Sequence, residues 1–144
     1  MKNTLFMILA MFLISICVIC GLIINIRAEK AEINRENREY EQYLNKKILG
    51  TDVATLINKV VDKNEKNGVQ KNEKGYYIDN GENSIKIDLK MTTIDKTYPM
   101  EEIYNNQITL FVQNFNFISF ECTSIEYHKK TGKISKLIFE ELPN

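Results

Sequence analysis

The start of the chain constrains its fold most, because residues 4–26 (TLFMILAMFLISICVICGLIINI) include no charged side chain. As an α-helix this run would be roughly 35 Å long, which is enough to cross the hydrocarbon core of a bilayer. From Arg27 onward the chain becomes rich in Lys, Glu and Asn. The sequence therefore predicts a short tail over residues 1–3, a transmembrane anchor over 4–26 that lies in the lipid bilayer, and a water-facing part.

The apolar run is predicted to be a permanent anchor and not a removable signal. A secretory signal has an apolar region of about 7 to 15 residues and a cleavage site made of small residues. The run here is longer and ends in NIR, without a small-x-small pattern. We therefore expect the uncleaved signal-anchor of a single-pass protein, with a late cleavage after Ala31 as the open alternative.

Basic residues beside the anchor allow two orientations. Lys2 precedes the anchor, and four basic residues follow it: Arg27, Lys30, Arg35 and Arg38. This count taken alone would place the long part of the chain in the cytoplasm. The very short tail with its single Lys is instead typical of the cytoplasmic start of a signal-anchor. We expect an extracytoplasmic domain in the cell membrane, and the cytoplasmic orientation stays open.

Composition limits the partners of the water-facing part. The 144 residues include nineteen basic and nineteen acidic side chains, so the chain lacks the basic excess that drives binding to nucleic acid. Lys greatly outnumbers Arg, and Asn and Ile are abundant, which indicates an AT-rich bacterial genome. About 115 residues remain after the anchor, enough for one small domain and a stalk.

Residues 27–49 are predicted to form a helical stalk. The segment has no Pro or Gly and is full of helix formers. Ile26, Ile33 and Tyr40 recur every seven residues, with Leu44 beside them, as a thin apolar seam. This seam could meet a partner helix, or it could be the one face by which a solvated helix docks on the chain's own domain.

The remaining residues, 50–144, are predicted to form a small α+β domain. Gly50 is interpreted as a left-handed cap that ends the stalk. A helix follows up to Asn67 and Gly68, because apolar residues recur at helical spacing at Val53, Leu56, Ile57, Val60 and Val61. Strand signals come next, so this helix should cover a sheet.

Two hairpins and a second helix complete the predicted domain. Residues 75–91 read as a hairpin around the turn DNG, and Pro99 to Asn114 as a helix, with a strand for ITLFVQ as the rival interpretation. Residues 117–140 read as a second hairpin around KKTGK, with a bulge near Thr123 and Ser124. The predicted order is αββαββ with a four-stranded antiparallel sheet. The expected core is Val53, Leu56, Ile57, Val60, Ile85, Ile87, Leu89, Phe111, Phe115, Phe120, Leu137 and Phe139.

Cysteine and histidine offer the strongest candidates for chemistry. Cys17 and Cys20 lie one helical turn apart, which raises a redox or metal interpretation, but in hydrocarbon a thiol behaves as a small apolar group. Cys122 and His128 lie six positions apart on one predicted strand, so their side chains would be about 20 Å apart. We therefore expect a buried structural Cys122 and a surface His128.

Other candidates are also expected to be structural. The adjacent carboxylates and the tyrosines beside the DNG turn are expected to be exposed, the tyrosines as hairpin contacts or, alternatively, as ligand contacts: Glu101, Glu102, Glu140, Glu141, Tyr76 and Tyr77. A phosphate-binding glycine loop is absent from the sequence. No catalytic, cofactor-binding or metal-ligating residue is assigned.

The order of apolar helix, helical stalk and small α+β domain resembles pilin-like and pseudopilin-like membrane-anchored bacterial proteins. This resemblance implies a subunit of a cell-surface or secretion assembly. Gly21 lies inside the apolar run and the first glutamate is Glu29, so no functional residue is carried over from that family. The resulting hypothesis is a non-enzymatic interaction module that binds a protein partner or self-associates. The alternative is a membrane-tethered domain that binds a small ligand or peptide in a groove between the 99–114 helix and the sheet.

Overall fold

The structure, a computed structural model, describes residues 2–106 and 108–143. The chain divides into two compact units, Met1–Glu36 and Asn37–Asn144, which are described separately. The first unit is most of helix α1 (Lys2–Glu41), and the second is an α+β domain that begins with the last residues of α1.

In the first unit, α1 carries its apolar side chains on the outside. From Phe6 to Ile26 these side chains are exposed, from 73% at Phe6 to 42% at Ile16. The hydroxyl of Ser15 donates to the main-chain oxygens of Met11 (3.1 Å) and Phe12 (2.8 Å), so its polar group is satisfied within the helix. The described part of the chain has one helix that is long and apolar enough to span a membrane, and it is α1.

The end of α1 belongs to the second unit, and the helix stops at Glu41 instead of continuing to Leu49. Asn45 adopts a left-handed conformation with φ of 56°, and its amide donates to the main-chain oxygen of Cys122 over 2.8 Å. The next residues form strand β1 (Lys47–Leu49), which pairs with the domain's own sheet. The predicted stalk is therefore too long, because tertiary pairing overrides helix propensity after Glu41. Tyr40 of the apolar seam is buried in the core of the second unit.

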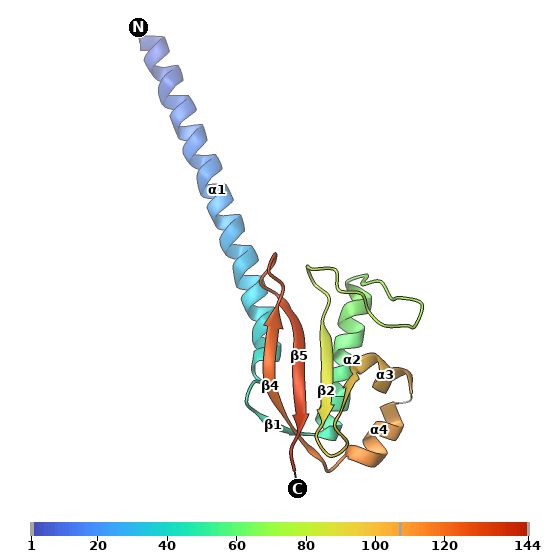
Figure 1. Ribbon diagram of the computed structural model, residues 1–144. Helices are drawn as coiled ribbons and strands as arrows, with labels where there is room; N and C mark the ends of the chain where they lie inside the picture. The colour runs from blue at the N-terminus through green and yellow to red at the C-terminus, as the bar shows by residue number, and fades with distance from the viewer. Residues whose placement is uncertain (1, 107, 144) are drawn as a thin grey trace. The chain divides into compact units, whose positions relative to one another are not determined.

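The sheet has five strands in the order β1-β4-β5-β2-β3 and is mixed. Three pairs are antiparallel, whereas β2 and β5 run parallel with Leu89 opposite Phe139. Figure 1 shows β4, β5 and β2 side by side. The predicted four-stranded antiparallel sheet is thus wrong in strand number and in this central pair. The strands after β1 are β2 (Lys86–Met91), β3 (Lys96–Pro99), β4 (Ser119–Tyr127) and β5 (Ile134–Glu141).

The predicted hairpin over residues 75–91 does not form. Residues 75–78 make a single isolated bridge, Lys71 to Tyr77, and β2 instead pairs with β3. Tyr77 is buried, and its amide donates to the carboxylate of Glu101 over 3.1 Å. The segment is therefore held by Glu101, and both edges of β2 are paired with other strands, β3 and β5. The second hairpin is confirmed, with the register shift between Cys122 and Ser124.

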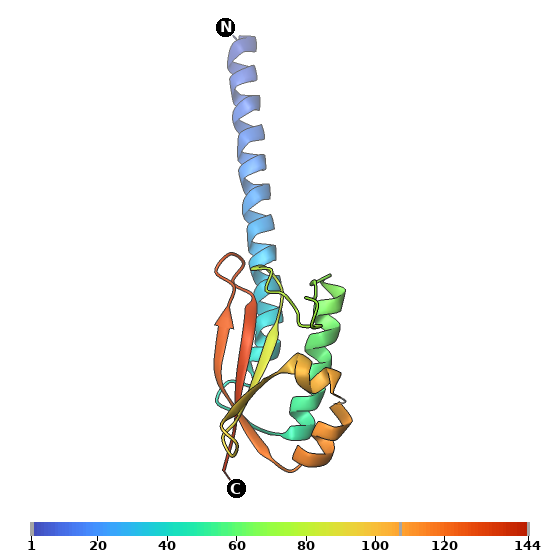
Figure 2. The ribbon, with the colours of Figure 1, turned by 45° about the vertical axis from the view of Figure 1, so that its right-hand side comes forward.

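The helices that follow β1 lie on one side of the sheet, as the turned view in Figure 2 shows. The predicted second helix is divided into two helices, and Gln107 lies outside the described residues. The strand alternative for ITLFVQ is wrong, because these residues are helical. Gly50 begins the first of these helices and does not adopt the predicted left-handed conformation. These helices are α2 (Gly50–Lys66), α3 (Met100–Asn105) and α4 (Ile108–Phe115).

The core fills the space between the helices and one face of the sheet. Every predicted core residue is buried except Phe115, which is half-buried and packs against the core. The other face of the sheet carries charged side chains, with ion pairs Lys136–Asp88 (3.1 Å) and Lys90–Glu140 (3.2 Å). Opposite charges on neighbouring strands are favourable on a solvated face.

Candidate functional site

A cavity of about 270 Å³ lies between helices α3 and α4 and the β3 edge of the sheet. Five of its lining residues are apolar: Met91, Ile103, Leu110, Phe111 and Phe115. Four are polar: Tyr98, Glu102, Asn106 and Asn114. The cavity is thus an apolar space with a few polar groups, and it lies where the sequence hypothesis of a ligand-binding domain placed a groove.

Helix α4 packs mainly on α2 and α3 and reaches the sheet through Phe111, whose ring centroid lies 6.1 Å from that of Phe120 on β4. Leu110, Phe111, Asn114 and Phe115 follow helical spacing, so one face of α4 is directed to the cavity. Phe111 stacks on Phe115 with ring centroids 5.2 Å apart. This aromatic pair forms part of the cavity wall.

Gly50 fixes the position of α4. A Cβ atom at residue 50 would lie 2.0 Å from the main-chain oxygen of Phe115. Only glycine therefore allows the start of α2 to approach the end of α4 this closely. Gly50 also donates its amide to the main-chain oxygen of Ile118 over 2.9 Å.

Charges near the cavity neutralise one another. The ammonium of Lys96 lies 4.1 Å from the ring centroid of Tyr98 and 3.6 Å from the carboxylate of Glu102. Interaction with the Tyr98 hydroxyl, and then with Glu102, raises the pKa of Lys96. The cavity therefore offers an apolar interior beside a balanced ion pair, which suits an uncharged group.

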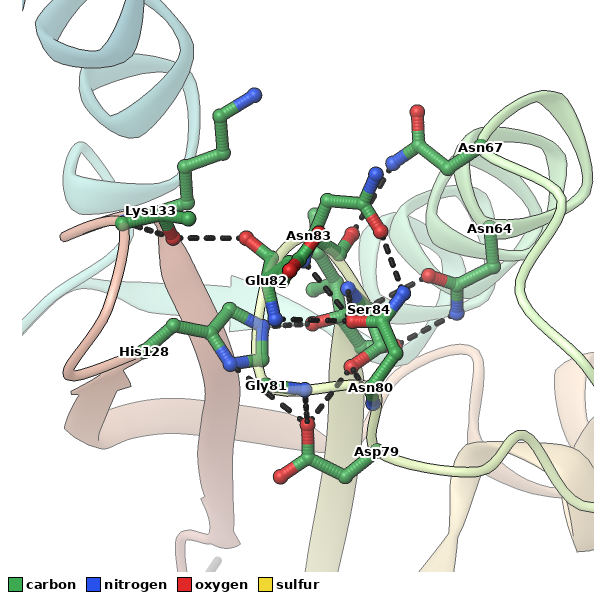
Figure 3. A network of polar contacts seen from close by, with 12 residues as sticks. Asn64, Asn67, Asp79, Asn80, Gly81, Glu82, Asn83, Ser84, His128 and Lys133 are labelled. Carbon is green, nitrogen blue, oxygen red and sulfur yellow. Dashed lines mark hydrogen bonds and ion pairs between the residues drawn. The ribbon is translucent and has the colours of Figure 1, made fainter.

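A second candidate site is a polar network around His128, drawn in Figure 3. His128 was expected at the surface, but its side chain is buried and the residue is only 5% exposed. Its Nε2 lies 2.7 Å from the main-chain oxygen of Ser84, so Nε2 carries the proton that it donates. Its Nδ1 lies 3.6 Å from Asp79 Oδ1. Sequence reasoning missed this cluster, although the Asn-rich and Asp-containing segment DNGENS is typical of a loop held by its own side chains.

The geometry of the network differs from that of a Ser-His-Asp triad. The Ser84 hydroxyl donates to Asp79 Oδ1 over 3.0 Å and accepts from the Asn80 amide over 3.2 Å. His128 Nε2 therefore bonds the main chain of Ser84 and not the hydroxyl that a general base would deprotonate. The pKa of Asp79 is lowered, first by the hydrogen bond from the Gly81 amide and then by the Ser84 hydroxyl.

The network holds a loop in place. Asn80 Oδ1 accepts hydrogen bonds from the amides of Glu82 (3.0 Å), Asn83 (3.0 Å) and Ser84 (3.1 Å). Lys130 of the β4–β5 turn forms an ion pair with the carboxylate of Glu82. The hydroxyl of Thr131, in the same turn, donates to the main-chain oxygen of Glu82. The loop of residues 79–84 is thereby fastened to the β4–β5 turn, which is a structural role.

Cys122 is buried as predicted, with 0% of its surface exposed. Burial raises the pKa of its thiol to about 11. Its Sγ lies 3.7 Å from the main-chain oxygen of Ser124, whereas His128 contacts Ser84. The structure thus gives the two residues separate partners and does not bring them together.

Two carboxylates and one tyrosine were expected to be exposed but are buried. Glu101 accepts the Tyr77 amide, and Glu141 accepts the Thr93 amide over 2.9 Å. The ammonium of Lys71 lies 4.6 Å from the Tyr77 ring centroid. Each of these side chains therefore fixes a loop.

Among residues 2–106 and 108–143, no group of three or more His, Cys, Asp or Glu side chains is arranged to hold a metal ion.

Comparison of the chain with models of known protein families, with curated proteins and with solved structures gives no match.

Proposed function

We propose that the chain is a single-pass membrane protein whose α+β domain is a non-enzymatic binding module, and that the cavity between α3, α4 and the β3 edge is its binding site. The cavity is the observation that carries this proposal, because it is an apolar space with an open mouth beside a sheet edge. Ligand sites of this kind are apolar spaces with a few polar groups that orient the ligand.

The exposure of α1 supports the membrane anchor. Large apolar side chains between Phe6 and Ile26 lie on the outside of the helix, and Ser15 bonds its own main chain. A lipid bilayer would cover such a surface without leaving unsatisfied polar groups. The location proposed for the domain is the extracytoplasmic side of the membrane. A place in a bacterial cell-surface or secretion assembly stays a prediction of the sequence.

The size of the cavity indicates the group that it takes. Its volume of about 270 Å³ lies just below the range of roughly 300 to 1,000 Å³ typical of sites for whole drug-sized ligands. It suits one aromatic ring or one branched aliphatic group.

The roles of the buried reactive groups support binding without catalysis. Glu101, Glu141 and His128 bond main-chain atoms of loops, and Cys122 has a raised pKa in the core. Each of these side chains is thus accounted for by the fold.

Disulfide capture of small apolar reagents tests the proposed site. Asn114→Cys places a thiol at the exposed mouth of the cavity in the full chain, held in lipid nanodiscs, in a Cys17→Ser, Cys20→Ser, Cys122→Ala background. Lys129→Cys, an exposed position on the β4–β5 turn, is the matched control. Phenyl and cyclohexyl disulfides are compared with hydroxyethyl disulfide under reducing competition, by mass spectrometry.

We expect the apolar reagents to be captured at residue 114 at least about tenfold better than at residue 129, because burying such a group contributes about 1.5 to 3 kcal/mol. Adding Leu110→Trp, which fills the cavity, should remove the preference. Equal capture at residues 114 and 129 would contradict the proposed site.

A further inference from the structure

We propose that the group entering the cavity is an apolar side chain of an extended peptide, and that the peptide adds to β3 as a sixth strand of the sheet. This inference rests on the proposed function and names the ligand class of the same site. It is carried by the position of the cavity beside an edge strand whose own side chain lines it.

Strand β3 is the outermost strand of the sheet. It pairs with β2 on one side, and its other side has no partner strand among the described residues. Such an edge offers main-chain groups to an incoming strand. Recognition of extended peptides by strand addition takes its affinity from these groups and its specificity from pockets for alternate side chains.

The register shows which groups of β3 are directed outward. Pro99 stands opposite Asp88 and has no N–H to donate, so this pair cannot exchange two hydrogen bonds. Pairs alternate along antiparallel strands, so the Tyr98–Leu89 pair is hydrogen-bonded and the Thr97–Lys90 pair is not. The amide and carbonyl of Thr97 therefore point away from β2, toward the open edge.

The same strand places a side chain in the cavity. Tyr98, next to Thr97, lines the cavity together with Leu110 and Asn114 of α4. An extended peptide paired to Thr97 would run between β3 and α4, and side chains on one of its faces would point toward the helices. Because the cavity takes one ring or branched aliphatic group, one apolar residue of the peptide would fill it.

Pro99 and Lys96 are residue types that discourage strand pairing at a sheet edge, but in β3 they leave this path open. Pro99 is the last residue of the strand, and the Lys96 ammonium is drawn over the Tyr98 ring and toward Glu102. Together they limit the free edge to a short segment around Thr97. This arrangement favours a specific peptide with an apolar side chain over unselective strand pairing.

Peptide selection on the full chain tests the inference. The probe is a displayed library of random dodecapeptides, selected on the chain in lipid nanodiscs after depletion on empty nanodiscs. We expect the enriched sequences to share one aromatic or branched aliphatic position. A synthetic peptide with the enriched sequence is then used for affinity measurements on variants.

Two matched pairs of variants separate the cavity from the edge. Leu110→Trp fills the cavity at a position that is 49% exposed, and Ile94→Trp adds the same side chain at a 57% exposed position outside it. Thr97→Pro removes the outward amide, and Thr97→Ala keeps it. We expect Leu110→Trp to bind about tenfold or more weakly than Ile94→Trp, and Thr97→Pro about tenfold or more weakly than Thr97→Ala, since each lost contact is worth about 1.4 kcal/mol or more.

Hydrogen exchange gives an independent readout in the unmodified chain. The Thr97 amide should exchange more slowly when the peptide is bound, because strand addition gives it an acceptor. No enriched peptide, or unchanged exchange at Thr97 with equal affinities for Thr97→Pro and Thr97→Ala, overturns strand addition. The disulfide capture at residue 114 would still decide the proposed function separately, because it uses no peptide.

Discussion

The side-chain amide of Asn64 makes two hydrogen bonds to the main chain of Ile85, donating to its oxygen over 2.7 Å and accepting from its amide over 2.8 Å. Asn37 makes the corresponding bonds to the main-chain oxygen of Gly132 (2.8 Å) and the amide of Ile134 (3.1 Å). The two parallel strands, β2 and β5, therefore both begin beside an asparagine that an α-helix supplies. These contacts position the central parallel pair.

Asn64→Ala should destabilise the domain strongly. The substitution leaves the buried amide and oxygen of Ile85 without partners, and each such group costs about 1 to 3 kcal/mol, so the expected loss is about 2 to 6 kcal/mol. Asn58→Ala is the matched control, because Asn58 is an exposed asparagine on the same helix. Urea unfolding followed by tyrosine fluorescence measures both; similar values for the two variants would disprove the role of Asn64.

Gly50→Ala should be more harmful than Gly68→Ala. The new Cβ at residue 50 would lie 2.0 Å from the Phe115 main-chain oxygen, so α4 must move. At Gly68, with φ of +66° and no described atom within 4 Å, the cost is the left-handed backbone alone, about 1 to 2 kcal/mol. We expect thermal unfolding to show the larger loss for Gly50→Ala, and disulfide capture at residue 114 to fall in that variant only. Equal losses with unchanged capture would show that α4 does not depend on Gly50.

Cys122 should make stability fall at alkaline pH. Burial raises the pKa of the thiol from 9.0 to about 11, so between these values the folded chain keeps a proton that the unfolded chain has lost. The contribution is fully present below pH 9 and is lost as the pH rises from about 9 to about 11. The stability difference between wild type and Cys122→Ala, measured by urea unfolding from pH 7 to 11, should shrink over this range. A constant difference would contradict the raised pKa.

Thiol labelling in intact cells checks the proposed topology. Lys129→Cys, with the native cysteines replaced as above, carries an exposed thiol on the β4–β5 turn. A membrane-impermeant maleimide should label it in intact cells if the domain is extracytoplasmic. The same chain without the engineered cysteine should stay unlabelled. Labelling only after lysis would place the domain in the cytoplasm.

Much of the fold could be predicted from local patterns. The apolar run, the helical spacing from Val53 to Val61 and the bulge near Thr123 and Ser124 depend on residues close in sequence, and the structure agrees with each. The strand pairing was harder, because β2 alternates apolar and charged residues as an antiparallel strand does. In the structure the charged face of β2 is solvated although its partner β5 runs parallel to it. The alternation therefore indicates which face is buried and not the direction of the neighbouring strand.

The candidate site could be predicted only in location. A groove beside the 99–114 helix follows from the order of helix and sheet, but the lining by Tyr98, Glu102 and Asn106 depends on the division between α3 and α4. The burial of His128, Glu101 and Tyr77 depends on partners 24 to 44 residues away in sequence. No periodic pattern reports such contacts.

Xenon binding observed by methyl NMR tests most directly whether the domain has an accessible apolar site. Apolar cavities bind xenon, and the methyl groups of Ile103 and Leu110 line this one. In the full chain in nanodiscs, we expect a saturable shift of both residues' methyl signals under xenon pressure, no shift at Ile57 in the packed core, and loss of the Ile103 shift in Leu110→Trp. Unshifted Ile103 and Leu110 signals in the wild type would contradict an accessible apolar site.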